Sequence, residues 1–320
     1  LYKKSQNKLI ISCLIFLAAV FEFLGLGLIY PLVSLLFDLG NQDNDFITSL
    51  KNLIEKIGLP YSRNSLIVYI IILIVSKSFV LIIHKFFCAK SSMTFMNEIR
   101  KEVYTKMTMS NFGIVSDKKS KLINAMTTQS AIAGGALDLL YRLIQTFFIM
   151  IALILLGISI SNKIFLLAIF LGLIIGYFLN ISIKYSKNLG INLANFNEKL
   201  LNNVSQSLNN YRYLKSVEKF DYYYDGLRPV LSNIFKTQLK FTLINRGTQI
   251  ITEPLVVTLL MLVLFAGLTF FGESTSSLFI IYLILARFFS SIIGFLRDLQ
   301  SYNKDIVSVK YCYNLIENTL

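Results

Sequence analysis

The sequence predicts an all-α, polytopic membrane protein with six transmembrane helices and two long cytosolic helical hairpins. Three observations lead to this prediction. The chain is 55% apolar with a mean hydropathy of +0.62, it contains six long apolar stretches, and its basic residues gather in alternate connections. Soluble domains are about 45–50% apolar, so the bulk composition already favours a membrane.

The apolar stretches are the strongest of the three observations. Each has about the 20 residues that an α-helix needs to cross about 30 Å of hydrocarbon. We place the spans at residues 9–37, 66–87, 139–161, 164–183, 250–271 and 278–295. One such stretch would fit a buried core helix, whereas six indicate a membrane protein. The first is too long, and too much part of a multi-span pattern, to be a cleaved signal peptide.

The net charge of +13 is distributed unevenly along the chain. Lys and Arg concentrate in the amino-terminal lead and in the connections 88–138 and 184–246, while the other connections carry few. The positive-inside rule therefore places both termini and the two long connections in the cytosol. We expect a multi-pass protein in the lipid bilayer of the plasma membrane, which in bacteria is the inner membrane. Because topology accounts for the charge, we expect no nucleic-acid partner.

The residue types that usually carry chemistry are sparse. Cys13, Cys88 and Cys312 are too few and too scattered for a disulfide framework or a metal site. His84 is the single histidine, and a lone intramembrane histidine can be catalytic in membrane acyltransferases. No supporting constellation accompanies it, so we interpret it as an interfacial polar residue. The sequence thus predicts no catalytic residue and no metal site.

The two long connections have the composition of helices. The connection 88–138 contains no proline, and 184–246 contains only Pro229. The second also carries an apolar stripe at steps of three or four residues, at Leu193, Phe196, Leu200, Val204, Leu208 and Tyr211. We expect arms of about 25 residues to project about 35–40 Å into the cytosol and to turn near 111–113 and 209–212. Such a stripe needs a partner, either neighbouring helices, a second copy or a soluble protein.

Charged residues inside the spans are candidates for function, because each costs about 2.5–3.5 kcal/mol on insertion scales. Glu22 lies near the middle of the first span and Lys77 at mid-depth in the second. Glu22 is interpreted either as a cavity-lining or gating carboxylate or as the partner of Lys77 in an interhelix pair, and the two are compatible.

Arg287 and Arg297 lie ten residues apart in and after the sixth span, close to three helical turns, so we expect them to share a face. A basic lining suits a substrate with phosphate or pyrophosphate, although Arg297 can equally snorkel to the cytosolic interface. Glu253-Pro254 interrupts the fifth span and predicts a kink, either for gating or static. The candidate substrate cavity comprises Glu22, Lys77, Arg287, Arg297, Gln249 and Glu253.

Six spans, cytosolic termini and two long hairpins resemble the transmembrane domain of an ATP-binding-cassette (ABC) exporter over the whole chain. Residues 208–215 are similar to the family's second coupling region, and residues 109–116 stand where the first would lie. The resemblance implies short coupling helices at the hairpin tips that dock on nucleotide-binding domains. The coupling residues would be Ser110, Asn111, Phe112, Gly113, Asn210, Tyr211, Arg212, Tyr213, Leu214 and Lys215.

Two further stretches resemble the lipid-linked oligosaccharide flippase branch of these exporters. Residues 21–32 combine an intramembrane Glu, small residues and a proline, and residues 301–316 are similar to that branch's exit from the sixth span. The resemblance implies an amphipathic, anionic lipid-linked glycan as substrate, moved by alternating access in a dimer with a second transmembrane domain, expected to be identical. Peptides or hydrophobic drugs are the alternative substrates.

The chain contains no Gly-x-x-x-x-Gly-Lys-Ser/Thr loop, so we expect it to hold no cofactor itself. The resemblance implies that ATP and Mg²⁺ bind a nucleotide-binding domain, either fused after Leu320 or separate. Because the first residue is Leu rather than Met, we expect a longer protein. A secondary transporter is less favoured because no internal repeat is apparent. A membrane enzyme would need catalytic polar residues at one depth, and the sequence shows no such cluster.

Overall fold

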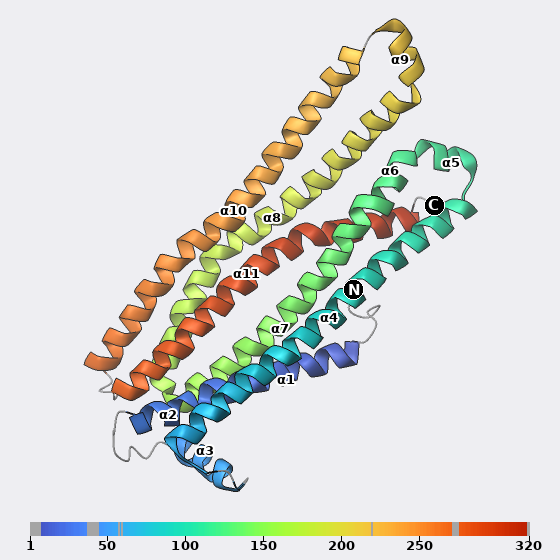
Figure 1. Ribbon diagram of the computed structural model, residues 1–320. Coiled ribbons are helices and arrows are strands. Elements are labelled where there is room, and N and C mark those ends of the chain that lie inside the picture. The colour runs from blue at the N-terminus through green and yellow to red at the C-terminus, as the bar shows by residue number, and fades with distance from the viewer. Residues whose placement is uncertain are drawn as a thin grey trace.

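The computed structural model describes residues 8–36, 45–56, 58, 60–218, 220–270 and 275–318, and within these the regular elements are all helical. Figure 1 shows an elongated bundle from which two helical hairpins project at one end, with the short helix α3 at the other. The predicted class, an all-α polytopic membrane domain, is confirmed.

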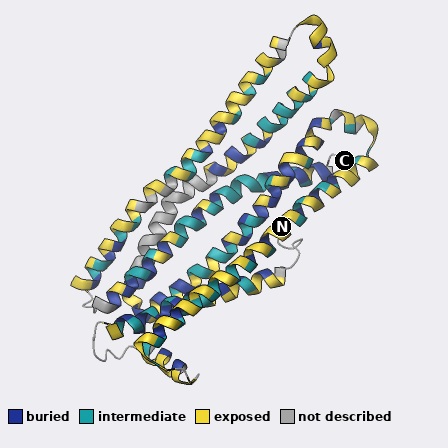
Figure 2. Cartoon of the chain, viewed as in Figure 1, coloured by how far each residue is buried: buried dark blue, intermediate teal, exposed yellow. Residues whose placement is uncertain are grey.

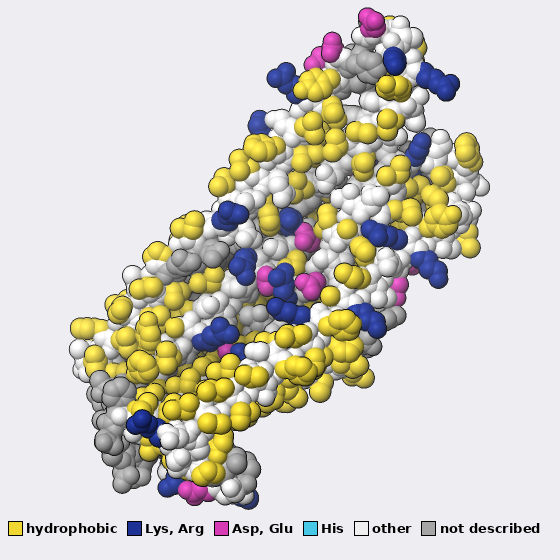
Figure 3. Space-filling view, viewed as in Figure 1, with side chains coloured by type: hydrophobic (Ala, Val, Ile, Leu, Met, Phe, Trp, Pro, Cys, Tyr) yellow, Lys and Arg dark blue, Asp and Glu magenta, His cyan; other side chains and the backbone are white. Residues whose placement is uncertain are grey.

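Within the described residues, four segments are long and apolar enough to cross a membrane: Leu9–Leu36, Arg63–Met109, Lys119–Ile160 and Ser277–Glu317. The predicted fifth span includes a shorter apolar stretch of helix, Pro254–Thr269, at the end of α10. The predicted fourth span, 164–183, has a helical backbone, but most of its side chains lie outside the described residues. Figure 3 shows hydrophobic side chains covering much of the surface around α1 and α4, whereas charged side chains gather mainly from the middle of the bundle to the tips.

The first span is divided into two helices, α1 (Lys8–Gly27) and α2 (Ile29–Leu36), separated by Leu28. The division follows from Pro31, which has no N–H to donate to the Gly27 carbonyl four residues earlier. The neighbouring bonds persist, since Leu28 N–H donates to Leu24 O at 3.0 Å. The single helix expected over 9–37 is therefore two consecutive helices.

Helix α3 (Asp45–Lys56) follows the first span and covers the end of the bundle. Its buried Ile54 packs with Leu28 and with Leu66 and Ile70 of α4. Helix α4 (Arg63–Met109) begins at Ser62, whose hydroxyl accepts from the Ser65 amide while the Ser65 hydroxyl accepts from the Ser62 amide. This reciprocal capping box satisfies two amides at the start of the helix.

Hairpin one consists of α4 and its return through α5 (Phe112–Asp117), α6 (Lys119–Asn124), the π-helix η2 (Ala125–Gln129) and α7 (Ser130–Ile160). The 47 residues of α4 give a helix about 70 Å long at 1.5 Å per residue, roughly twice what the bilayer requires. The helix continues well past its predicted span, as the absence of proline in 88–138 indicated.

Hairpin two consists of α8 (Asn162–Asn209), α9 (Tyr211–Val217) and α10 (Phe220–Thr269). Its tip lies at the same end of the molecule as the tip of hairpin one (Figure 1). Only Ser161 separates α8 from α7 at the opposite end, and there a Cβ on Gly157 would lie 2.2 Å from the Phe165 ring. Helix α10 runs unbroken through Pro229 and Pro254, so Pro254 does not end the helix, and the kink predicted there stays a prediction.

Helix α11 (Thr275–Asn318) lies centrally and packs mainly against α7, α8 and α10. One apolar core joins it to α2, α7, α8 and α10, and a second joins its carboxyl end to α1, α4, α6 and α7. Figure 2 shows buried residues concentrated on α7 and α11, with exposed residues along the outer faces of α4 and α10. The two cores therefore lie at the two ends of α11, and through them α11 packs against both hairpins.

Candidate functional site

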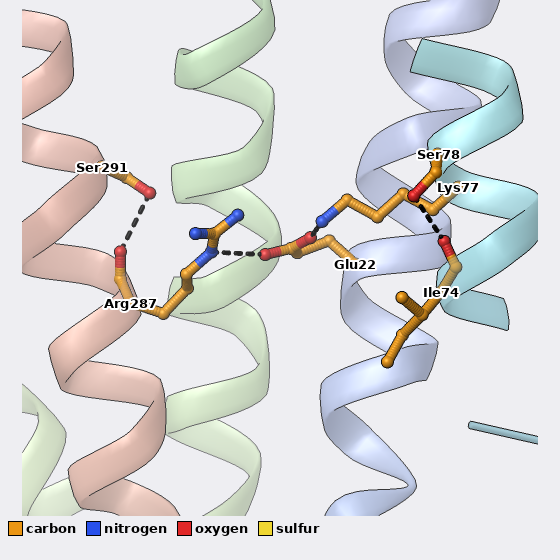
Figure 4. A network of polar contacts seen from close by, with 6 residues as sticks. All are labelled: Glu22, Ile74, Lys77, Ser78, Arg287 and Ser291. Carbon is orange, nitrogen blue, oxygen red and sulfur yellow. Dashed lines mark hydrogen bonds and ion pairs between the residues drawn. The ribbon is translucent and has the colours of Figure 1, made fainter. Parts of the chain in front are cut away.

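The carboxylate of Glu22 connects α1, α4 and α11 within the apolar spans. Its side chain is 4% exposed, and each of its two oxygens has its own cationic partner. Oε1 accepts a 2.9 Å hydrogen bond from Arg287 Nε of α11, and Oε2 accepts from Lys77 Nζ of α4. Figure 4 shows the two cations reaching Glu22 of α1 from opposite sides. The interhelix pair of Glu22 with Lys77 is thus present, and Arg287 joins it.

This cluster carries a surplus positive charge, because two cations share one carboxylate. Lys77 is 18% exposed, whereas Arg287 is 50% exposed, so the surplus is presented at Arg287. The bond to Glu22 uses Arg287 Nε and does not engage the two terminal nitrogens (Figure 4). Among the described residues these terminal nitrogens have no hydrogen-bond partner, and a guanidinium in that state can bind phosphate oxygens as a fork.

Arg297 lies in a different place. It lines a cavity of about 490 Å³ between α10 and α11, together with Val256, Val257, Ala286, Ser290, Ile293 and Gly294. Arg287 does not line this cavity and turns instead towards α1. The expected common face is therefore wrong, because ten residues fall about 80° short of three full turns at about 100° per residue.

The other two predicted cavity residues, Gln249 and Glu253, belong to α10 by their backbone. Their side chains lie outside the described residues, so their part in a substrate cavity stays a prediction.

The residues predicted at the two tips lie in the turns of the hairpins. Ser110 caps the end of α4, Asn111 follows, and Phe112 and Gly113 open α5. Phe112 is 87% exposed. The aromatic ring of Phe112 thus lies at the end of hairpin one, where the described residues do not cover it. Contact with an ATPase domain stays a prediction.

At the second tip, Asn210 precedes α9, which contains Tyr211, Arg212, Tyr213, Leu214 and Lys215. Tyr213 is 68% exposed, whereas Leu214 is 4% exposed. Leu214 therefore anchors α9 on its arm and presents no surface to a partner. The helix ends at Glu218, whose positive φ of 53° turns the chain into α10.

Two arrangements were not expected from the sequence. Arg142 of α7 lies 3.6 Å from Asp138 and 3.8 Å from Asp298 of α11, and only the Asp138–Arg142 spacing of four residues was a local signal. His84 is 2% exposed, with its Nε2 3.2 Å from Cys88 Sγ, so its side chain packs inside the bundle, and its place at the membrane interface stays a prediction.

The long apolar helices, the buried ionic cluster and the two projecting hairpins define a membrane-spanning domain of a transporter. Comparison with protein families supports this class, since the model of the ABC transporter transmembrane region matches residues 9–293. The chain belongs to this family, as an ABC exporter membrane domain. The family implies a nucleotide-binding domain as partner and a membrane as setting. Comparison with curated proteins gives no significant match.

Proposed function

We propose that this chain is the substrate-translocating domain of an ATP-driven flippase that moves an anionic, lipid-linked glycan. The observation that supports this most directly is the surplus cation of the Glu22–Lys77–Arg287 cluster, presented on Arg287 at membrane depth. An unbalanced charge is costly there, and a phosphate or pyrophosphate would balance it. The cavity beside Arg297, with its apolar walls, offers a second contact for such an amphipathic molecule.

The hairpin tips suit coupling to an ATPase domain. Both lie at the end of the molecule remote from α3, and both expose aromatic side chains, Phe112 and Tyr213. We place this end, and both termini, on the cytosolic side of a bacterial inner membrane, because the basic connections form the hairpins. ATP and Mg²⁺ would bind the nucleotide-binding domain, fused or separate.

A second copy of the chain completes the proposed transporter. The arm of α10 exposes an apolar row at four-residue steps, Leu231, Phe235, Leu239 and Leu243. These residues belong to the stretch 184–246, which we place outside the bilayer, so lipid would not cover them. A face of this kind is typical of an interface between subunits.

Transport by the complete protein in lipid vesicles tests the substrate. The probe is a fluorescent pyrophosphate-linked glycolipid, and ATP-dependent movement between leaflets is measured. We expect Arg287→Gln to lower the rate at least tenfold. In this variant Glu22 still pairs with Lys77, so the cluster is neutral and we expect the fold to be retained. Thermal unfolding checks the fold. Arg63→Gln, an exposed arginine at the start of α4, is the matched control and should leave the rate unchanged.

A hydrophobic cationic dye serves as the second probe. If the protein moves the dye and leaves the glycolipid in place, the substrate is a hydrophobic drug and the glycolipid proposal is wrong. If Arg287→Gln leaves glycolipid movement at the wild-type rate, the role of the cluster is overturned.

A further inference from the structure

Glu198 connects three helices that come from distant parts of the chain. Its Oε1 lies 3.3 Å from Lys121 Nζ of α6, and its Oε2 accepts a 3.2 Å hydrogen bond from the Tyr311 hydroxyl of α11. Lys121 belongs to hairpin one and Glu198 to hairpin two, while α11 is the last helix of the chain. One carboxylate thus contacts both hairpins and α11.

The contacts of Glu198 are partly shielded from water. Its side chain is 20% exposed, and the core beside it includes Leu122 of α6 and Cys312 of α11, both almost fully buried. Its partner Lys121 is 45% exposed, so the ion pair is shielded from water only on the Glu198 side. Glu198 therefore lies at the edge of a packed core, where a displacement of any one helix is felt by the others.

The return arm of hairpin one has an irregular turn next to this contact. The π-helix η2 follows α6 directly, and such turns are frequent at functional sites. Asn124 and Gln129 are fully buried at its two ends, with Gln129 Nε2 3.5 Å from Asn124 Oδ1. Among the described residues, Gln129 Oε1 has no hydrogen-bond partner. The arm is thus least regular where it reaches Lys121, which favours local rearrangement there.

A cavity of about 320 Å³ is lined by residues of η2, α7, α8, α10 and α11, among them Asn197, the residue before Glu198. Its lining includes the polar side chains of Gln129, Asn197, Gln238 and Ser308. A polar cavity of this size has room for several waters, each of which occupies about 30 Å³ in the liquid. Packing between hairpin two and α11 is therefore incomplete beside Asn197, although the two backbones are in close contact at Gly190 and Lys304 in the wall of the same cavity.

We infer that Glu198 is a positioning residue that makes hairpin one, hairpin two and α11 move together during the transport cycle. In the described part of the chain each carboxylate oxygen has one partner, so a displacement of α8 from α6 breaks one contact and a displacement from α11 breaks the other. The inference rests on the proposed function, since it assumes that an ATPase domain moves the hairpins.

The ratio of substrate moved to ATP hydrolysed tests this role in the complete transporter. Glu198→Gln keeps the shape of the side chain and removes its charge, and we expect the ratio to fall at least threefold while ATP hydrolysis continues. Glu98→Gln, an exposed glutamate on α4, is the matched control and should keep the wild-type ratio. The charge exchange Lys121→Glu with Glu198→Lys should restore the ratio to within twofold of wild type.

An unchanged ratio in Glu198→Gln overturns the inference, as does a charge exchange that performs no better than Glu198→Gln alone. If Glu198→Gln folds poorly, Tyr311→Phe removes only one of the two contacts, and we expect a smaller fall of the same ratio.

A second measurement needs no substrate and separates this inference from the proposed function. Spin labels at Lys187→Cys of α8 and Lys310→Cys of α11 report the distance between the two helices. Cys13, the exposed native cysteine, is replaced by Ser for this purpose, since Cys88 and Cys312 are buried. We expect ATP to shift one narrow distance in the wild type, and Glu198→Gln to broaden it. If ATP shifts the distance but no glycolipid is moved, only the substrate is wrong. If wild type and Glu198→Gln behave alike, the role of Glu198 is wrong.

Discussion

The backbones of α8 and α11 cross in close contact at Gly190 and Lys304. A Cβ on Gly190 would lie 2.5 Å from the Lys304 carbonyl oxygen and 2.9 Å from its Cα. The opposing atoms belong to the backbone, so no side-chain rotation relieves the clash. Hairpin two therefore reaches α11 this closely only because residue 190 has no side chain.

Gly190→Ala should destabilise the protein by forcing the two helices apart. Overpacking of this kind costs about 1–3 kcal/mol. The measurement is the midpoint of thermal unfolding in detergent, which should fall by several degrees. Gly226→Ala on α10 is the control, because its Cβ would meet nothing within 4 Å, and there alanine favours the helix. Equal midpoints for both variants would contradict the close crossing.

Gly157→Ala tests the tight turn between α7 and α8. Its Cβ would lie 2.2 Å from the ring of Phe165, which is fully buried, so we expect a loss of about 1–3 kcal/mol. Combining it with Phe165→Leu removes part of the ring and should recover some of that loss. Gly135→Ala, with open space around its Cβ, is the control. If the double variant is no more stable than Gly157→Ala, the contact with Phe165 is not the cause.

We expect Glu22→Gln and Lys77→Met to lower the stability of the protein by different amounts, which a double-mutant cycle measures. Glu22→Gln leaves Lys77 and Arg287 without their shared counter-charge, and removing one partner of a buried pair costs about 3–5 kcal/mol. Lys77→Met leaves Glu22 paired with Arg287 and should cost less. The double variant Glu22→Gln/Lys77→Met should therefore be more stable than Glu22→Gln, as measured by thermal unfolding.

The exposed pair Lys51–Glu55, 3.9 Å apart, supplies the control cycle. Its coupling should be near zero, since solvent screens exposed pairs. A coupling at Glu22–Lys77 that is no larger would mean that the cluster is more hydrated than its burial indicates.

The apolar row on α10 predicts a charge-sensitive interface. Leu239→Asp would introduce a carboxylate into the row and should lower the dimer fraction in detergent at least fivefold, because a buried unpaired charge is costly. Light scattering of the purified protein measures the fraction. Ser232→Asp adds the same charge beside the row on an exposed position and should leave the fraction unchanged. Equal effects, or a monomeric wild type, would exclude this face as the dimer interface.

The class of fold was predictable because its signals are local. Hydropathy over about 20 residues locates a span, and the run without proline in 88–138 shows that α4 continues beyond it. The division of the first span at Leu28 follows from Pro31, which the sequence displays. The continuity of α10 through Pro254 was not predictable, since a proline in a membrane helix can be accommodated by its neighbours.

The ionic contacts were only partly predictable. A charge inside a span marks Glu22, Lys77 and Arg287 individually, but 265 residues separate Glu22 from Arg287 and no periodicity joins them. Glu198 and Tyr311, 113 residues apart, carry no signal at all, because a glutamate and a tyrosine in stretches that we place outside the bilayer are ordinary residues. Such pairs depend on how the helices pack, which one sequence does not encode locally.

The one-residue turn at Ser161 can act as a pivot for the long arm of hairpin two. Helix α8 extends 48 residues, or about 72 Å, from that turn, so a rotation of about 5° about it would carry the tip through about 6 Å. One helical turn from the pivot, the same rotation moves a side chain by only about 0.5 Å. A rigid rotation of the long arm would therefore turn a large displacement at the tip into a small displacement, with a larger force, near Ser161.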